Sequence, residues 1–397
     1  MIKIMAVNAG SSSLKFQLLD MPEETVITSG IVEKIGQPES IYTIKYNGQK
    51  RETNPVVKDH AEAVNLLLND LIELKILNSL DEIKGVGHRV VQGGEYFKDS
   101  CLLGETEIEK ISELADLAPL HNPAHVVGIR AFKKALPEVP AVAVFDTTFH
   151  QTMAKEAYLY ATPYEWYEKY GVRKYGAHGT SHRYVSERIC ELNNLDYNSS
   201  KVIVLHIGNG ASISAVKNGK CVDTSMGLTP LGGIPMGTRS GDLDPAVLEF
   251  MYKKEGLNVI EEIQMLNKKS GYLGMSGVGS DARDLTKGMK EGNERCKIAF
   301  DVQAKRIVDF IAQYYVYMGG CDAIAFTAGI GENVAHLRKN ICDRLAVLGV
   351  KLDEQLNDTF SDERRISTLD SKIKVWIVPT NEEVMIARDT IRLGNIN

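Results

Sequence analysis

The pattern of apolar and polar positions predicts a strand, a short polar turn and a second strand within the first twenty residues. Ile2, Ile4, Ala6 and Val7 follow the pattern of a buried strand, and an alternating apolar pattern resumes at residues 14–19. The turn at residues 10–13 is Gly-Ser-Ser-Ser, and Lys15 follows it. Backbone N–H groups of such a turn, together with a lysine, can surround phosphate oxygens. An ordinary β-hairpin has the same pattern, so this turn alone leaves both interpretations open.

The same pattern recurs about two hundred residues later in the chain. Residues 202–207 predict a strand that leads into a glycine turn and a second alternating segment, so that Val7 matches Ile207, Gly10 matches Gly210 and Ser12 matches Ser212. A third glycine-rich turn is expected at residues 328–333, after the apolar run 323–327. This self-similarity predicts two related α/β halves that face a shared cleft, an arrangement suited to a nucleotide.

The remaining periodic segments predict alternating helices and strands. A continuous apolar run at residues 140–145 is typical of a buried parallel strand, and it ends at Asp146. Helices are expected at residues 61–76, at residues 122–135 with Asn122 as the cap, and at residues 295–318, where two glycines end the helix. A strand is expected at residues 373–378. A last helix follows it after residue 380, with a capping-box pattern that begins at Thr380. The alternation favours the α/β class.

Composition narrows the class of protein. The chain has 397 residues, 44% of them hydrophobic, which is enough for two or three globular domains. A net charge of −6 and a pI near 5.9 argue against nucleic acid and anionic membranes as partners. The six cysteines form no C-x-x-C pair, and we expect them to be reduced core residues. The sequence shows neither a leader pattern nor an apolar run of about eighteen residues, so we expect a cytoplasmic protein.

Several single residues are candidates for chemistry, and each has a plain structural alternative. Arg239 lies between glycines in a loop, where it can reach into a cleft or be solvated. The same two interpretations hold for Arg89. His178 lies between an alanine and a glycine at a predicted helix start, where histidine also serves as a structural residue. Asp146 and Glu382 can act as helix caps or interact only with a helix dipole. A P-loop, a kinase signature set and a metal-binding cysteine or histidine cluster are absent from the sequence.

Together the segments that carry these residues resemble one family, the acetate kinases, over essentially the whole chain. The resemblance lies in residues 7–16, 88–91, 119–123, 145–147, 178–182, 206–210, 226–231, 236–245, 329–333 and 379–383. It implies an α/β fold of two duplicated ribonuclease-H-like domains with a hinge and a central cleft, as in actin, sugar kinases and heat-shock ATPases. The expected domains are residues 1–148 plus 381–397, and the nucleotide-binding residues 149–380. The resemblance also implies a homodimer.

The resemblance implies a reversible, Mg²⁺-dependent reaction in which ATP and acetate give ADP and acetyl phosphate by direct in-line transfer, with Mn²⁺ as a possible substitute ion. Asn8 and Glu382 would serve the metal. The catalytic residues would be Asp146, His178, Arg239 and Arg89, and the substrate would meet Arg89, Val91, Leu120 and Pro230. The nucleotide would be bound by Ser12, Lys15, His206, Ile207, Gly208, Asn209, Gly210, Asp281, Ala282, Arg283, Gly329, Ile330, Gly331, Glu332 and Asn333.

The chemistry of phosphoryl transfer changes the role expected for one of these residues, Asp146. Phosphoryl transfer needs alignment and neutralisation of the oxygen charges, which a metal ion, an arginine and a histidine donor can supply. The family assigns Asp146 as the acid/base residue. An aliphatic carboxylate is already ionised at pH 7, however, so the attacking oxygen needs no base. We therefore expect Asp146 to orient an arginine or a metal-bound water.

Two positions depart from the family pattern, and because of them the sequence does not decide which acyl acid is the substrate. Ala177 stands where many members have Phe, and Gln92 stands where His is common. A smaller side chain can enlarge an acyl pocket, and one methylene discriminates by only about 1–3 kcal/mol. Propionate kinase is therefore the first alternative. The others are a chaperone-like ATPase switch and a nucleotide-binding module without catalysis.

Overall fold

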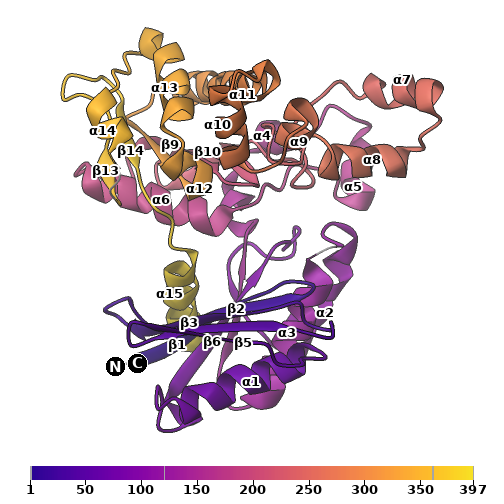
Figure 1. The fold of residues 1–397 in the computed structure, drawn as a ribbon, viewed down its shortest axis with the longest axis vertical. Coiled ribbons are helices and arrows are strands. Elements are labelled where there is room, and N and C mark those ends of the chain that lie inside the picture. The colour runs from indigo at the N-terminus through magenta and orange to yellow at the C-terminus, as the bar shows by residue number, and fades with distance from the viewer. Residues whose placement is uncertain (1, 120, 360–361, 397) are drawn as a thin grey trace. The chain divides into compact units, whose positions relative to one another are not determined.

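The computed structural model describes all residues except 1, 120, 360–361 and 397. The chain folds into two compact units, residues 1–149 with 381–397 and residues 150–380. Each unit is built around a mixed β-sheet with helices packed against it (Figure 1). The predicted α/β class is therefore confirmed.

The first unit contains an eight-stranded sheet in the order β5-β4-β3-β2-β1-β6-β8-β7. Strands β1 to β5 pair antiparallel in succession, whereas β1, β6 and β8 are parallel to one another. The strands are β1 (Ile2–Ala9), β2 (Ser13–Met21), β3 (Thr25–Glu33), β4 (Ile41–Tyr46), β5 (Gln49–Thr53), β6 (Ile83–Val90), β7 (Cys101–Leu102) and β8 (Ala141–Phe145). All five residues of β8 are buried, as expected for a central parallel strand.

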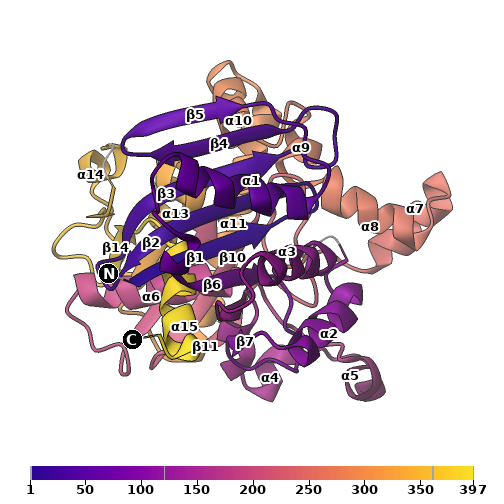
Figure 2. The same ribbon diagram turned by 90° about the horizontal axis from the view of Figure 1, so that it is seen from below.

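Helices cover both faces of this sheet (Figures 1 and 2). They are α1 (His60–Glu73), α2 (Glu105–Glu113), α3 (Asn122–Ala135) and α15 (Glu382–Gly394). Apolar residues of α1 and α3 share a core with one face of β1 and β2, and α15 packs on β1, β6 and β8. A Cβ atom on Gly87 of β6 would lie 2.3 Å from Ile386 and 2.4 Å from Thr390. Glycine at this position therefore allows α15 to lie close against the sheet.

The second unit repeats the central topology of the first. Its six-stranded sheet has the order β11-β10-β9-β12-β14-β13. Strands β9, β10 and β11 are antiparallel neighbours, and β9, β12 and β14 are parallel, which matches the order β3-β2-β1-β6-β8 of the first unit. The strands are β9 (Lys201–Ile207), β10 (Ala211–Lys217), β11 (Lys220–Thr224), β12 (Ala323–Thr327), β13 (Arg364–Arg365) and β14 (Lys374–Ile377). The expected duplication is visible in this shared strand order.

Helices of the second unit also pack on both faces of its sheet, with α6 on one face and α11 on the other (Figure 1). The helices are α4 (Lys155–Tyr158), α5 (Tyr164–Tyr170), α6 (Gly179–Leu192), α7 (Ala246–Glu255), α8 (Val259–Lys268), α9 (Gly271–Ser276), α10 (Ala282–Lys290), α11 (Glu294–Met318), α12 (Ala328–Asn333), α13 (Ala335–Arg344) and α14 (Glu354–Asp358). Short 3₁₀ helices lie at Leu80–Glu82, Leu114–Asp116, Thr148–Thr152 and Ala346–Leu348.

The two hairpins are related, but the predicted residue equivalences between them are wrong. Ala9 pairs with Leu14 in the first hairpin, and Ile207 pairs with Ala211 in the second. Ala9 therefore corresponds to Ile207, and this shift removes the matches Val7–Ile207, Gly10–Gly210 and Ser12–Ser212. The physical reason is that Gly10 is the first residue of its turn, whereas Gly210 is the last residue of a turn that is one residue shorter. Its Gly208 N–H donates to the Gly210 carbonyl, whereas the Gly10 N–H donates to Ser13.

Three local predictions also need correction. Asn122 is the first residue of α3 rather than its cap, and its side chain binds the backbone N–H and C=O of Gln92. The cap of α15 is Asn381 rather than Thr380, because the Asn381 side chain accepts from the Val384 N–H. Residues 328–333 form the short helix α12 instead of an open turn. Of these three outcomes, that of Asn122 depends on a contact between segments far apart in the sequence.

The long amphipathic helices agree with the sequence pattern. Helix α3 has the predicted bounds, α11 begins one residue earlier than expected, and Gly319 ends α11 in the left-handed conformation. The six cysteines are free thiols. Across the part of the chain that the structure describes, the search for a helix long and apolar enough to cross a membrane finds none.

Candidate active site

In the first unit, an arginine and an aspartate form a largely buried ion pair. Arg89 is near the end of β6, and Asp146 directly follows β8, the parallel neighbour of β6. Arg89 Nε donates to Asp146 Oδ1 over 2.9 Å, and Nη2 donates to Oδ2 over 2.7 Å. Burial opposes the charged form of Arg89, but the charges of Asp146 and Glu382 outweigh it and raise the pKa of the guanidinium. Arg89 therefore stays ionised, and two hydrogen bonds fix its orientation relative to Asp146.

A second group of polar side chains surrounds this pair. Asn8 of β1, Lys15 of β2, Arg89 and the first two residues of α15, Glu382 and Glu383, line one small pocket. Lys15 Nζ lies 2.6 Å from Glu383 Oε1, and Arg89 Nε lies 4.0 Å from Glu382 Oε2. Burial raises the pKa of Glu382, and the charges of Asp146 and Glu383 act in the same direction. The structure thus brings together four of the predicted residues, Asn8, Lys15, Arg89 and Glu382.

The donor set of this pocket suits a hard divalent cation. Asn8 supplies an amide oxygen and Glu382 a carboxylate oxygen, with Glu383 alongside. Mg²⁺ is typically held by one or two carboxylates, waters and substrate phosphates rather than by a full protein cage. In line with such a sparse set, the described residues contain no group of three or more His, Cys, Asp or Glu side chains arranged to hold a metal.

In the second unit, His178 and Arg239 converge on the turn between β9 and β10. A Cβ atom on Gly210 would lie 3.6 Å from His178 Nε2 and 3.6 Å from Arg239 Nη1. Arg239 Nη1 donates to the Pro230 carbonyl over 3.1 Å, and burial lowers the pKa of the guanidinium. Among the described residues, Arg239 forms no ion pair with an acidic side chain. This guanidinium is therefore available to an anionic ligand.

His178 itself has an unusual backbone conformation. It precedes α6 with φ 57° and ψ 23°, in the left-handed region that non-glycine residues rarely adopt. Its ring stacks on that of His206, with centroids 4.2 Å apart. Such strain is concentrated at functional sites, where the surroundings hold it in place.

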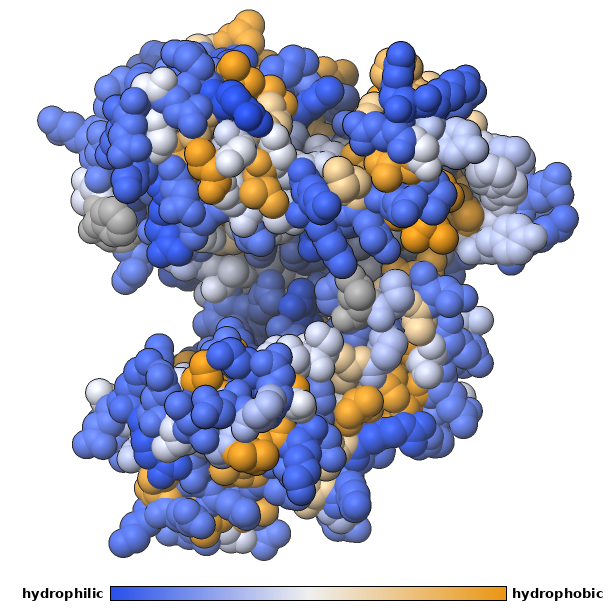
Figure 3. Space-filling model, turned by 45° about the vertical axis from the view of Figure 1, so that its right-hand side comes forward, coloured by the Kyte–Doolittle hydropathy of each residue, from blue (hydrophilic) through white to orange (hydrophobic). Residues whose placement is uncertain are grey.

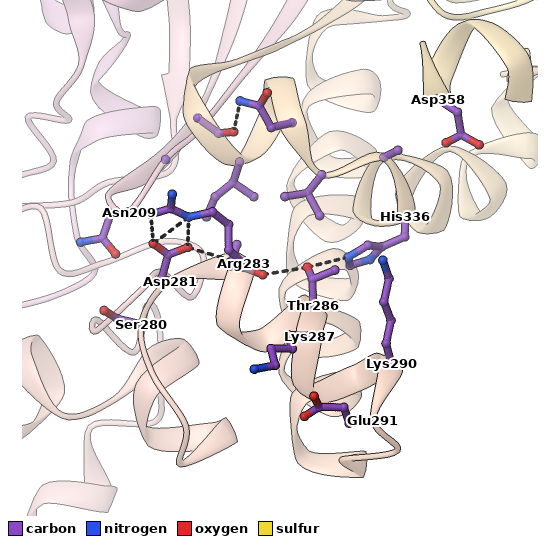
Figure 4. A pocket seen from close by; sticks show the side chains of 17 residues that line it. Asn209, Ser280, Asp281, Arg283, Thr286, Lys287, Lys290, Glu291, His336 and Asp358 are labelled. Atoms are coloured by element: carbon purple, nitrogen blue, oxygen red, sulfur yellow. Dashed lines mark hydrogen bonds and ion pairs between the residues drawn. The ribbon is translucent and has the colours of Figure 1, made fainter. Parts of the chain in front are cut away.

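A cavity of about 1390 Å³ lies beside this turn (Figure 4). Gly208 and Asn209 line the cavity. The turn that contains Gly210 therefore also borders the cavity. Arg283 Nη2 pairs with Asp281 Oδ2 at 2.6 Å and lowers the pKa of Asp281 to about 2. The predicted nucleotide residues that line the cavity are Gly208, Asn209, Asp281, Ala282, Arg283, Gly329, Ile330 and Asn333.

Other predicted nucleotide residues do not line this cavity. Ser12 and Lys15 belong to the first unit. His206 makes a 2.8 Å hydrogen bond to Ser181 through Nδ1, and Ile207 is buried in the core. Gly210, Gly331 and Glu332 lie next to lining residues, in the same turn or in α12.

The sequence reasoning missed several lining residues. Figure 4 shows Thr286, Lys287, Lys290 and Glu291 on α10 and its end, and His336 on α13. Thr286 lies 3.2 Å from His336 through their Oγ1 and Nε2 atoms. Ser280, Val334, Ala335 and Asp358 also line the cavity. The helical spacing of Lys287 and Lys290 after Arg283 was a usable signal, because residues three and four apart share a face.

The structure describes two of the three apolar residues that were predicted to contact the acyl group. Val91 is buried at the end of β6, and Pro230 binds Arg239 through its carbonyl. Leu120 lies outside the described residues. Both departures from the family pattern have local partners: Gln92 Oε1 accepts from the Gly94 N–H, and the Ala177 carbonyl lies 3.0 Å from His150 Nε2.

Comparison with known proteins agrees with this geometry. A family profile described as the Acetokinase family matches residues 3–388. An acetate kinase of Acholeplasma laidlawii is 58% identical over 99% of this chain and 100% of its own length. The crystal structure of Porphyromonas gingivalis acetate kinase has a TM-score of 0.95 at 45% identity, covering 99% of this chain and 100% of that one. A propionate kinase from Francisella tularensis has a TM-score of 0.93 at 42% identity, with the same coverage.

The fold and the full-length relatives define a phosphotransferase with two sheet-based units. The chain belongs to the acetokinase family. The resemblance found in the sequence and the fold it implied are therefore confirmed, and the family uses ATP and a divalent metal.

Proposed function

We propose that the two sets of side chains described above carry out the acetate kinase reaction, the activity that the full-length similarity assigns to this chain. In it, an acetate oxygen bonds to the γ-phosphorus of ATP, the bond to the bridging oxygen breaks, and acetyl phosphate and ADP are formed. The observation that carries the site assignment is the turn at Gly208–Gly210. One part of it borders the large cavity, and His178 and Arg239 converge on the other.

The roles of the residues follow from charge. Arg89 binds the acetate carboxylate, and the bidentate contact from Arg89 supports an orienting role for Asp146. His178 and Arg239 stabilise the charge on the equatorial oxygens of the transferred phosphoryl group. The cavity around Asn209 and Arg283 takes the nucleotide, and Val91, Leu120 and Pro230 take the methyl group.

Asn8 and Glu382 hold the metal ion, which we propose to be Mg²⁺. When bound, the ion neutralises phosphate charge and fixes the phosphate geometry. Lys15 lies in the same pocket and contributes a further positive charge, now shared with Glu383.

The proposed assembly is a homodimer, and the proposed location is the cytoplasm. Helices α7 and α8 support the dimer, since Glu262 is their only buried residue. Phe250 is 58% and Ile260 68% exposed, alongside Val247, Tyr252, Val259 and Ile263. Figure 3, which brings the right-hand side of Figure 1 forward, shows a mostly hydrophilic surface in which hydrophobic side chains form separate groups. An apolar cluster on two adjacent helices is typical of a protein interface.

Trapping of the product with hydroxylamine tests the function. Purified protein is incubated with MgATP and formate, acetate, propionate or butyrate, and hydroxamate and free phosphate are measured together. Hydroxamate formed mainly from acetate is the expected result. A larger yield from propionate would assign the propionate kinase alternative, and free phosphate without hydroxamate would indicate an ATPase.

A further inference from the structure

A buried hydrogen-bond chain connects His178 to a second histidine, His182. Nδ1 of His178 and Nε2 of His182 lie 2.8 and 2.7 Å from the same atom, Oγ of Ser212. The His182 backbone N–H donates to the His178 carbonyl in the first turn of α6, and Ser212 lies on β10. Ser212 and His182 are completely buried. One serine hydroxyl therefore bridges the two rings away from solvent.

The number of available hydrogens determines the direction of this chain. A serine hydroxyl has one hydrogen, so Ser212 donates to one ring and accepts from the other. Nδ1 of His182 is buried and has no hydrogen-bond partner among the described residues. A proton on that nitrogen would be a buried donor without an acceptor, which is unfavourable. A neutral His182 therefore carries its proton on Nε2 and donates it to Ser212.

The surroundings keep His182 neutral. Burial lowers its pKa well below the ordinary value, and His150 and His206 add to the effect. The rings of these neighbours lie 5.7 and 6.1 Å from the ring of His182, between centroids. A second proton on His182 would place a charge among imidazoles in the protein interior.

We propose that His182 and Ser212 are positioning residues that fix the tautomer of His178. Because Ser212 accepts from His182, its own hydrogen goes to Nδ1 of His178, and the proton of the His178 ring stays on Nε2. Nε2 is the atom that lies near Gly210, beside Nη1 of Arg239. His178 thus presents an N–H donor on the side where Arg239 presents its guanidinium.

The consequence is catalytic, and it rests on the proposed role of His178. An N–H donor can bind the negatively charged oxygens of a phosphoryl group in transfer, whereas the opposite tautomer would present a lone pair to them. A donor fixed before the substrate binds needs no rearrangement during the reaction.

The tautomer can be measured directly on the unmodified protein. Two-bond ¹H–¹⁵N correlation spectra of protein labelled with ¹⁵N-histidine distinguish protonated from unprotonated ring nitrogens, and the signal of His178 is assigned from its loss in His178→Gln. The expected result is a protonated Nε2 and an unprotonated Nδ1 for His178 in the free enzyme. A protonated Nδ1 in the neutral ring would overturn the proposal.

A matched pair of serine variants tests the cause. In Ser212→Ala, part of the His178 population should shift to the Nδ1–H tautomer, and kcat should fall about tenfold while KM for ATP changes by less than about twofold. The control is Ser214→Ala, on the same strand, where an equally buried hydroxyl lies 3.0 Å from Thr224 Oγ1. The control should keep the wild-type tautomer. An unchanged tautomer in Ser212→Ala would contradict the proposal.

Two variants at His182 separate hydrogen bonding from packing. His182→Gln keeps an N–H donor near the place of Nε2 and should retain the His178 tautomer, whereas His182→Leu fills similar space without a donor and should lose it. Loss in both would assign His182 a packing role and refute the proposal. Full kcat in His178→Ala would instead refute the proposed catalytic role, and the tautomer spectrum of the wild type would still test the hydrogen-bond chain.

Discussion

At the scale of single residues, the two units differ in how each holds its candidate arginine: the first pairs Arg89 with a carboxylate, and the second leaves Arg239 without one among the described residues. Arg89 is bound bidentately by Asp146, whereas Arg239 contacts the Pro230 carbonyl and, within the described chain, no acidic group. A paired guanidinium is rigid, and an unpaired, partly buried one has the most to gain from an incoming anion. Because of this difference, we expect the replacement of Arg239 and the disturbance of Arg89 to change different kinetic quantities.

Arg239→Ala should lower kcat by roughly 10³-fold or more, by analogy with arginines that stabilise phosphoryl transition states. Nucleotide affinity should change little, because Arg239 does not line the large cavity. Steady-state kinetics and nucleotide titration measure the two quantities. Arg188→Ala is the control, since Arg188 forms an ion pair with Glu363 elsewhere in the second unit. A weakened nucleotide affinity with normal kcat would contradict the assigned role.

Asp146→Asn should mainly misalign Arg89. An amide cannot accept both guanidinium bonds, so kcat/KM for acetate should fall by about 10²-fold, the scale expected from a small displacement of a binding group. The pH–rate profile should keep all the ionisations of the wild type, because no proton is transferred. Asp99→Asn, which alters an exposed pair with Arg392, is the matched control. Loss of one ionisation with unchanged metal affinity would identify Asp146 as a proton acceptor.

Metal affinity should depend on pH through Glu382. A metal binds the carboxylate and not the acid, and burial raises the pKa of Glu382. Protonation therefore begins at a higher pH than for an ordinary glutamate, and the apparent Kd for Mg²⁺ should rise as the pH falls toward that pKa. Titrations of Mg²⁺ at several pH values, monitored by calorimetry, measure this effect. Glu382→Gln should bind the metal weakly and without this pH dependence, so an identical pH dependence in that variant would exclude Glu382 as its source.

At the scale of elements, the β9–β10 turn lies between the large cavity and the side chains of His178 and Arg239. A Cβ at Gly210 would meet His178 and Arg239 at ordinary contact distances, so Gly210→Ala should fold with nearly wild-type stability. The added methyl would occupy the space next to both side chains and should lower kcat by roughly 10²-fold. Thermal unfolding and steady-state kinetics measure these outcomes. A variant with full activity would show that no reacting group lies beside Gly210.

The elements were predictable where a regular apolar pattern decides the structure. Helices α3 and α11 and strand β8 follow the spacing of their apolar residues, and the family resemblance indicated eight of the 17 residues that line the cavity. Caps and turns were not predictable in this way. The side chain of Asn122 binds the backbone of Gln92, a contact that only the folded chain creates. Asn381, by contrast, caps α15 through a local bond from the Val384 N–H, a role that the sequence pattern assigned to Thr380. The equivalence of the two hairpins failed because the matched glycines occupy different places in the two turns, Gly10 the first and Gly210 the last.

Contacts within the candidate site were also not predictable from the local sequence pattern. Arg89 and Asp146 are 57 positions apart, and their contact follows from the parallel pairing of β6 and β8, which the local pattern of the sequence does not contain. Likewise, Ser212 lies outside the family segments, and the segment 178–182 contains His182 without indicating what that side chain contacts. Only the distances to one hydroxyl oxygen identify them as partners of His178.

At the scale of the whole molecule, the exposed apolar residues of α7 and α8 should be covered by a second copy of the chain. Ile260→Arg would place a charge in that contact, so it should shift the protein from dimer to monomer while each chain stays folded. Analytical ultracentrifugation measures the mass, and circular dichroism checks the fold. Val316→Arg, at an exposed valine on α11, is the control. A wild-type protein that sediments as a monomer would refute the dimer.

Helix α15 returns to the first sheet after the second unit has been completed, and it packs on β1, β6 and β8. During synthesis the strands of the first unit leave the ribosome long before this helix does. Until residues 381–394 emerge, one face of the first sheet has no cover and Glu382 is missing from its pocket. Residues 150–380, by contrast, are contiguous and can fold as soon as they are made. The first unit is therefore completed only after residues 150–380 have been made, and the pocket that contains Asn8, Lys15 and Arg89 acquires Glu382 only at that stage.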